Sequence, residues 1–205
     1  MSAREQLEED RLRANLYGLL ANLLNSPPAD ATLRLLTSAR TGPDDDGPLA
    51  GCWHDLGTEA ACRTPARLDD EFHRLFIGLG RGEVVPYGSW YLCGRLMDKP
   101  LAQLRTDLAK LQIERRPESR ETEDHAAALC ETMALISGPG TSVSRGRQRD
   151  FYLRHLASWM PRFFQDLQKA PSARFYRAVG RTGAVFLDME TACFELAEEL
   201  SPAVG

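Results

Sequence analysis

The chain has 205 residues, of which 43% are hydrophobic and 26% charged, so it can bury a core and is expected to form one domain over residues 1–205. Its formal net charge of −4 argues against a general nucleic-acid binder. The five cysteines form no Cys-x-x-Cys pair, which argues against a disulfide scaffold and favours reduced thiols.

The first residues are acidic and polar and then become rich in leucine. They lack the basic start and apolar run of a signal peptide. No apolar run of the sequence approaches the roughly 20 residues that span a bilayer. We therefore expect a cytoplasmic protein with no stable membrane insertion. The leucines recur at helical spacing, which predicts a helix from Glu5 to Asn25 that ends at Ser26-Pro27-Pro28.

Helical patterns continue through most of the chain, and no stretch alternates as a strand does, so the predicted fold class is all-α. Pro161 predicts a break just before it in the helix that contains it. The Gly138–Gly146 loop is a candidate hinge between two helical parts. Serines at positions 89 and 172 are expected to cap the helices that follow them. We expect helices at residues 30–39, 49–61, 65–77, 89–97, 99–111, 122–137, 148–170 and from 172 onward, with loops at 41–48 and 78–88.

The stretch from Arg120 to Ile136 places acids and a histidine directly before an apolar run. His125 lies four residues before Leu129 on the apolar stripe, which predicts that it sits at the edge of the buried face. Glu123 and Asp124 would then occupy the first helical turn, where the helix dipole favours acids. Two interpretations remain: a charged helix start with a half-buried histidine, or a polar pair at the rim of a binding groove.

Motifs for catalysis or metal binding are weak. A di-iron bundle needs two Glu-x-x-His repeats, which are missing, and Cys52, His54 and Cys62 fit no usual zinc spacing. Gly78–Gly82 follows a helix rather than a strand, which favours a turn with positive φ angles over a nucleotide loop. We therefore expect neither an enzyme nor a metal site. A helical metalloenzyme or nucleotide hydrolase is the enzymatic alternative.

The segment from Arg145 to Arg181 is basic, with eight arginines and one lysine against two aspartates. Either it binds nucleic acid, or its arginines pair with the acidic N-terminal half or stay solvated. Its aromatic residues fall on the predicted core stripe, which favours pairing or solvation over nucleic-acid binding. We expect no nucleic-acid partner, and a helical nucleic-acid-binding regulator that uses this region is the alternative function.

Three short motifs follow one another in the sequence. They are FHRLF at Phe72–Phe76, VPYGSWY at Val85–Tyr91 and ETEDH at Glu121–His125. In this order and spacing, they resemble the TorD/DmsD family of molybdoenzyme maturation chaperones. The resemblance extends over roughly residues 67–190. The chain departs from the family pattern at residues 72, 88 and 122, where it has phenylalanine, glycine and threonine in place of a larger aromatic, an acid and a proline.

The resemblance implies an all-helical cytoplasmic chaperone that is not an enzyme. Such a protein binds the twin-arginine signal peptide, and often the apo-form, of a molybdenum-containing oxidoreductase catalytic subunit. It assists cofactor insertion and delays export until the cofactor is in place. The resemblance implies no bound cofactor, although some members bind guanine nucleotide weakly. It also implies a monomer or a dimer that exchanges segments through a hinge, here near residues 138–146.

The resemblance further implies where the peptide binds. A twin-arginine peptide offers two guanidinium groups followed by an apolar stretch, which carboxylates beside an aromatic groove would bind. Leu75 and Phe76 also fit a helix face that packs in the core, and Glu121 also fits a helix start. The implied peptide-binding positions are Phe72, Leu75, Phe76, Pro86, Tyr87, Ser89, Glu121, Asp124 and His125, and Trp90 adds an aromatic wall beside them.

Overall fold

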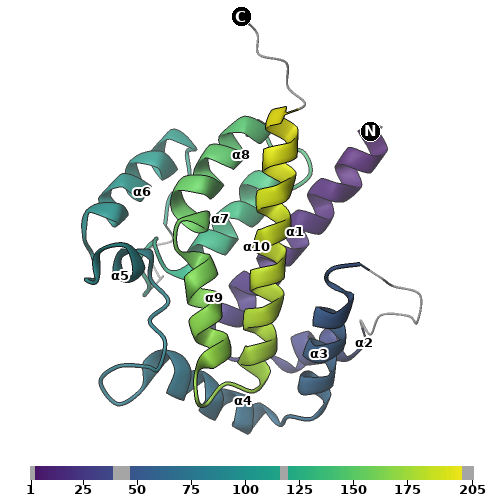
Figure 1. Ribbon diagram of the computed structural model, residues 1–205, viewed down its shortest axis with the longest axis vertical. Helices are drawn as coiled ribbons and strands as arrows, with labels where there is room; N and C mark the ends of the chain where they lie inside the picture. Colours follow the sequence, from purple (N-terminus) through teal and green to yellow (C-terminus); the bar gives the residue numbers. More distant parts are fainter. Residues whose placement is uncertain (1–2, 39–46, 116–119, 200–205) are drawn as a thin grey trace, which may run out of the picture.

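The computed structural model describes residues 3–38, 47–115 and 120–199 (Figure 1). Within these ranges every named element is a helix, which confirms the all-α prediction. The predicted loop at residues 41–48 lies mostly outside the described residues. The elements in chain order are α1 (Ala3–Asn25), α2 (Asp30–Ser38), α3 (Ala50–Ala61), α4 (Pro65–Phe72), η1 (His73–Ile77), α5 (Gly88–Cys93), α6 (Lys99–Lys110), α7 (Ala126–Ser137), α8 (Arg145–Tyr152), η2 (Leu153–Ala157), α9 (Met160–Lys169) and α10 (Phe175–Glu199).

Two predicted interruptions appear where proline and glycine place them. The helix around Pro161 breaks at Ser158-Trp159, and Pro161 then sits in the first turn of α9, where its missing N–H breaks no hydrogen bond. Gly78 ends η1 with a φ of 61°, and Gly80 has a φ of 93°, which confirms the predicted turn. The π-helical segments η1 and η2 were not expected from the sequence pattern.

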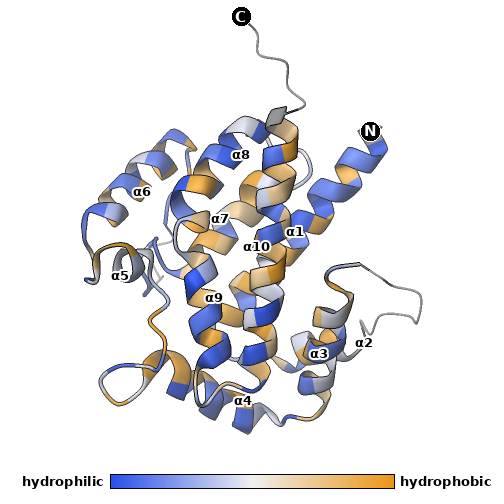
Figure 2. Cartoon of the chain, in the orientation of Figure 1, coloured by the Kyte–Doolittle hydropathy of each residue, from blue (hydrophilic) through white to orange (hydrophobic). Residues whose placement is uncertain are grey.

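Helix α10 runs through the middle of the structure, with α9 packed beside it (Figure 1). Helix α10 packs against α9 and α3, and α1 packs along α7 and also touches α10. Figure 2 shows hydrophobic residues on the sides of α9 and α10 that face other helices, and hydrophilic residues on the outer side of α4. Gly183 of α10 lies against the ring of Phe164 in α9, where an added Cβ atom would overlap the ring. Glycine at this position therefore permits close contact between α9 and α10.

The start of α10 is capped by a carboxylate from another helix. Glu71 of α4 is 8% exposed and accepts backbone N–H bonds from Arg174 and Tyr176, each at 2.8 Å, and from Phe175 at 3.3 Å. An acid at this position satisfies free N–H groups and complements the helix dipole. The expectation that Ser172 caps this helix is wrong, because Ser172 instead bonds to Glu83.

A buried ion pair links α1 to α10. Arg13 donates to both oxygens of Glu190, with N–O distances of 2.6 and 2.8 Å, and Tyr17 donates to the same carboxylate at 2.9 Å. Arg13 also donates to Gln148 of α8 at 3.1 Å, and Gln148 donates to the carbonyl of Val143. Burial raises the pKa of Tyr17 well above its ordinary value. The network joins three helices to the loop that was predicted as a hinge.

Helices on both sides of the Gly138–Gly146 loop pack against one another, since α10 touches α1, α3 and α4, and α7 touches α8. This packing brings helices that precede the loop into contact with helices that follow it. The hinge and the single-domain assignment remain predictions. None of the described helices combines the length and the hydropathy that crossing a membrane would require.

Candidate peptide-binding site

The second and third motifs lie side by side in the structure. Tyr87 and His125 form an isolated antiparallel β-bridge. The Gly88 N–H donates to the carbonyl of Asp124 at 2.9 Å, and the Ala126 N–H donates to the carbonyl of Pro86 at 2.8 Å. Segments 36 to 40 residues apart in sequence are thus joined by backbone bonds at the junction of α5 and α7. We call residues 86–89 and 121–126 the motif junction.

Asp124 is a structural centre of the motif junction. Its side chain is almost fully buried, with 3% of the residue exposed, and accepts from the Ser89 N–H at 2.9 Å and from the Thr122 hydroxyl at 2.6 Å. The carboxylate therefore accepts a hydrogen bond from an N–H group in the first turn of α5, a helix from another part of the chain. Ser89 lies inside α5 and is not its cap, which corrects the expectation for that residue.

Helix α7 begins at Ala126, four residues later than the sequence pattern predicts. Glu121, Glu123 and Asp124 thus precede the helix, and the expectation that Glu123 and Asp124 fill its first turn is wrong. The physical reason is that each acid has a partner outside α7. Glu123 accepts from Arg105 at 3.0 and 2.9 Å, and these bonds hold its pKa below the ordinary value although burial opposes them. Glu121 accepts from the hydroxyl of Tyr87.

His125 is the N-cap of α7 and is 5% exposed. Its Nδ1 accepts from the Ala127 N–H at 3.1 Å, and its ring meets the edge of the Tyr87 ring at a centroid distance of 4.9 Å. Burial lowers the pKa of His125 to about 4, against the opposing charges of Glu121 and Asp124. The imidazole is therefore neutral near pH 7 and carries its proton on Nε2. Within the described residues, Nε2 makes no hydrogen bond.

A pocket of about 360 Å³ opens beside the motif junction, between α1 and α7. It presents two carboxylates, a neutral imidazole and two amides, and several glycine and alanine residues leave room between the helices. Carboxylates and amide oxygens are the acceptors that a guanidinium group prefers. We call this the acidic pocket and define it by Gly18, Asn22, Asn25, Glu121, His125 and Glu131.

The first motif lies in the core. Phe72 is 7% exposed and Leu75 is fully buried. Phe76 is half-buried, and its ring meets the edge of the Tyr176 ring in α10 at 5.3 Å. Phe72 and Phe76 therefore pack against Tyr176 of α10, whereas backbone hydrogen bonds join the other two motifs to each other. Their packing supports the interpretation that the face with Leu75 and Phe76 belongs to the core.

The side chains of the second motif, Val85–Tyr91, differ in how far they are buried. Pro86 is buried, and Tyr87 and Trp90 are half-buried. The guanidinium of Arg81 lies over the Trp90 ring, 4.7 Å from its centroid. Burial and the bond to Glu121 raise the pKa of the Tyr87 hydroxyl well above its ordinary value, so Tyr87 stays protonated as a donor. Trp90, which lies in α5, is therefore a partly exposed aromatic ring in contact with a cation of the same chain.

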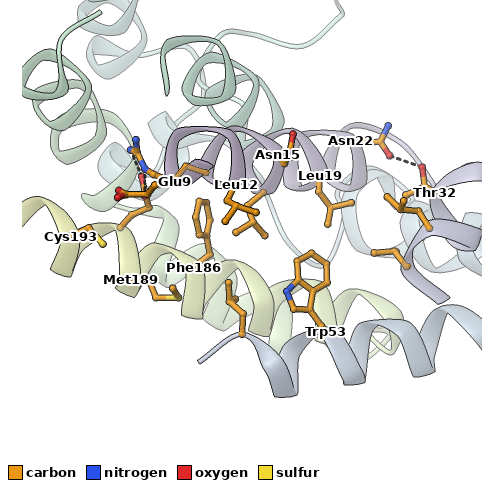
Figure 3. Close-up of a pocket in the computed structure, with 16 residues that line it drawn as sticks. Glu9, Leu12, Asn15, Leu19, Asn22, Thr32, Trp53, Phe186, Met189 and Cys193 are labelled. Atoms are coloured by element: carbon orange, nitrogen blue, oxygen red, sulfur yellow. Dashed lines mark hydrogen bonds and ion pairs between the residues drawn. The ribbon is translucent and has the colours of Figure 1, made fainter. Parts of the chain in front are cut away.

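A larger cavity, which the sequence analysis missed, lies along a neighbouring side of α1 and shares Asn22 with the acidic pocket. It has a volume of about 840 Å³ and is enclosed by α1, α2, α3 and α10 (Figure 3). Leu12 and Leu35 are 57% and 61% exposed, although their spacing suggests buried positions. The signal was present in α1, whose leucines occupy more of the helix circumference than one buried stripe needs. We call this the α1 trough and define it by Leu12, Leu16, Leu19, Leu35, Trp53 and Phe186.

The basic segment pairs with acids elsewhere in the chain. Arg145 contacts Glu9 at 2.7 Å and Asp10 at 3.3 Å, both in α1. Arg181 pairs with Asp55 of α3. These contacts confirm the expectation that arginines of this segment dock onto the acidic N-terminal half, so the basic segment is in part an internal contact surface.

Chemically reactive groups are few around the motif junction. Cys130 follows His125 on α7, but burial raises the pKa of its thiol to about 12, so it remains protonated. Within the described residues, no three His, Cys, Asp or Glu side chains come together as metal ligands do. Cys52 is buried and Cys62 exposed, so these two thiols face different surroundings. The arrangement suits the binding of a cation or peptide more than covalent chemistry.

Comparison with known proteins agrees with this architecture. Residues 43–165 match the family model described as nitrate reductase delta subunit. The match covers more than half of the chain, so the protein belongs to this family, which includes the TorD chaperones. The resemblance that the three motifs indicate is thereby confirmed.

Individual relatives are moderately similar. The chaperone protein TorD of Vibrio cholerae is 27% identical over 137 residues, and that of Aliivibrio fischeri is 30% identical over 133 residues. The matched region is about 62% of the length of these two relatives. The chlorate reductase assembly chaperone protein of Ideonella dechloratans is 27% identical over 172 residues, which are 79% of this chain and 80% of that protein.

A solved structure from Archaeoglobus fulgidus, described as a candidate redox enzyme maturation protein, has the same fold. It superposes with a TM-score of 0.60 and 17% identity, and the match covers 87% of this chain and 94% of that one. At this level of identity the likeness concerns the fold alone. It agrees with the all-helical architecture that the motifs imply.

Proposed function

We propose that this protein is a maturation chaperone for the catalytic subunit of a molybdenum-containing oxidoreductase. It holds the twin-arginine signal peptide, and with it the apo-form of the subunit, until the cofactor is inserted. It performs no chemistry, holds no cofactor of its own and works in the cytoplasm. Membership of a family that includes named chaperones supports this proposal.

The single observation that carries the proposal is the acidic pocket beside the motif junction. Glu121 and Glu131 line it together with His125, whose Nε2–H remains available as a donor. Carboxylates are the groups that arginine binds with paired N–H donors, and this pocket brings two of them together. The chemical character of the pocket therefore matches that of a ligand that carries guanidinium groups.

The geometry divides the motif residues by role. Glu121 and His125 line the acidic pocket and are the residues proposed to contact the peptide. Asp124 and Ser89 are buried and bonded to each other, so they act as positioning residues that hold Glu121 and His125 in place. Tyr87 positions Glu121 through its hydroxyl.

Titration calorimetry with a synthetic peptide tests the proposal. The peptide carries two adjacent arginines followed by an Ala/Leu stretch of about 14 residues, and a matched peptide carries two lysines instead. We expect the arginine peptide to bind more tightly, because lysine cannot form bidentate bonds to a carboxylate. Glu131→Gln should weaken the arginine peptide and remove most of the preference for arginine over lysine. Equal binding of both peptides, or no binding of either, would contradict the proposal.

Affinity capture of bound proteins from cells tests which client this protein binds. The tagged protein should recover a molybdoenzyme catalytic subunit that still carries its leader. The same subunit expressed without the leader should be recovered at a much lower level. Recovery that does not depend on the leader would show that the acidic pocket is not the recognition site.

A further inference from the structure

We propose that the α1 trough binds the apolar stretch that follows the two arginines in the client's leader. In the trough this stretch forms a helix that runs antiparallel to α1. This inference rests on the proposed function and extends it to a surface outside the three motifs. It names residues that no motif contains, chiefly Leu12, Leu35 and Trp53.

The two cavities adjoin on α1. Asn22 lines both the acidic pocket and the α1 trough. Its amide oxygen accepts from the Thr32 hydroxyl at 3.3 Å, at the end of the trough opposite Glu9 and Cys193 (Figure 3). A chain that leaves the acidic pocket over Asn22 therefore enters the trough directly.

The trough has the length and the lining for a helical segment. It follows α1 from Glu9 to Asn22, which at 1.5 Å per residue is about 20 Å, or between three and four helical turns. Figure 3 shows Leu12 and Leu19 projecting from α1 toward Phe186 and Trp53, with open space between them. A row of apolar side chains with one open side is the geometry in which an amphipathic or apolar helix docks.

Charge complementarity selects the occupant. The acidic pocket at one end has a lining that contains the acidic residues Glu121 and Glu131, and the trough beside it is lined mainly by apolar side chains. The matching ligand carries positive charge immediately before an apolar run of about 14 residues. A twin-arginine leader has this order. With its arginines near Asn22, its apolar stretch must run toward Glu9, opposite in direction to α1.

The first test separates the trough from the pocket with two peptides. One is the arginine peptide with its Ala/Leu stretch, and the other has that stretch replaced by Gly/Ser. We expect Leu12→Glu and Leu35→Glu each to weaken the apolar peptide by about tenfold or more and to leave the Gly/Ser peptide unchanged, since only the apolar peptide would fill the trough. Leu7→Glu is the matched control, because Leu7 is also on α1, is 54% exposed and does not line the trough.

The outcomes distinguish the two proposals. If the apolar peptide binds wild type but neither trough variant weakens it, the trough assignment is wrong and the proposed function stands. If neither peptide binds wild type, the proposed function fails as well. If trough variants abolish self-association of the purified chain and not peptide binding, the trough is an interface between two copies instead.

The direction of the segment can be read with Cys193. Its thiol is exposed at the Glu9 end of the trough, whereas the exposed Cys93 lies on α5. A peptide with an activated aryl disulfide at its C-terminus should form a mixed disulfide with Cys193, in which the thiolate attacks the peptide sulfur and the aryl thiolate leaves. The same group at the N-terminus should react with Cys193 at least about tenfold more slowly, because it would lie near Asn22. Faster reaction from the N-terminus, or at Cys93, would overturn the proposed direction.

Discussion

The motif junction and the α1 trough are opposite kinds of surface on neighbouring parts of the molecule. The junction carries the residues that identify the family, yet most of its polar atoms are bonded to each other, and Asp124 and His125 are only 3% and 5% exposed. The trough carries no family motif, yet it leaves Leu12 and Leu35 more than half exposed. The motif residues thus mainly hold a shape, while the unmarked leucines offer surface to a partner.

This difference teaches that a sequence motif can mark the scaffold of a site as well as its contact surface. Asp124 binds the first turn of α5 and so fixes the loop that positions Tyr87 and Glu121. Its charge is satisfied inside the protein. The residues that remain open to a ligand are those on the rim of this scaffold and along α1.

The largest effect is expected beneath the trough, where the surface meets the core. Arg13→Ala leaves Glu190 buried at 2% exposure without its cation and should destabilise the fold by about 3–5 kcal/mol. Arg11→Ala, on the exposed side of the same helix, is the control and should cost less than about 0.5 kcal/mol. Urea unfolding measures both. Equal losses for the two variants would show that the ion pair does not support the trough.

The motif junction should lose stability as the pH falls. The unfolded chain protonates His125 near pH 6.5, whereas the folded chain does so only near pH 4. Acidification through this window therefore favours unfolding, by up to about 3 kcal/mol, and the stability is fully present above pH 6.5. His125→Asn keeps a capping acceptor and should lose less stability between pH 7.5 and pH 4.5 in urea titrations. Parallel losses in both proteins would mean that His125 is not held neutral.

Asp124→Ala tests whether the junction is a scaffold. It removes the acceptor of the buried Ser89 N–H and should destabilise the fold by about 1–3 kcal/mol. Glu123→Ala, which removes only a pair with the half-exposed Arg105, should cost about 0.2–1 kcal/mol. Thermal unfolding by circular dichroism ranks the two. A larger loss at Glu123 than at Asp124 would reverse the comparison.

The smallest effect on stability is expected within the trough. Leu12→Ala should cost less than about 0.5 kcal/mol, because the side chain is 57% exposed, whereas Leu20→Ala on the buried face of α1 should cost about 2–5 kcal/mol. Unfolding of the two variants in urea compares them directly. A large loss for Leu12→Ala would place that residue in the core and remove it from the peptide surface.

Much of the fold could be predicted from sequence, because its signals are local. Leucine spacing predicts α1, and Pro161 predicts the break before α9. The start of α7 could not be predicted, because Asp124 and Glu123 bond to α5 and to Arg105, which are distant in sequence. The family motifs include Glu121 and His125, which line the acidic pocket, but they also include residues such as Leu75 and Asp124, which do not line it.

The trough was not predicted from the sequence, because it too depends on contacts between helices that are distant in the chain. An exposed leucine at helical spacing looks the same in a sequence as a buried one, so Leu12 and Leu35 were indistinguishable from core residues. Only the packing of α2, α3 and α10 around α1 shows which leucines are left uncovered. The clue available in the sequence is the excess of leucines around α1.

Tryptophan fluorescence tests the central claim most directly, because the two regions each contain a half-buried tryptophan. Trp53 lines the trough, and Trp90 lies in α5, directly after residues 86–89 of the motif junction. The account predicts that the arginine peptide with its apolar stretch shifts the emission of wild type and of Trp90→Phe, and that Trp53→Phe removes the shift. A shift that survives in Trp53→Phe and disappears in Trp90→Phe would place the peptide at α5, beside the motif junction, and contradict the account.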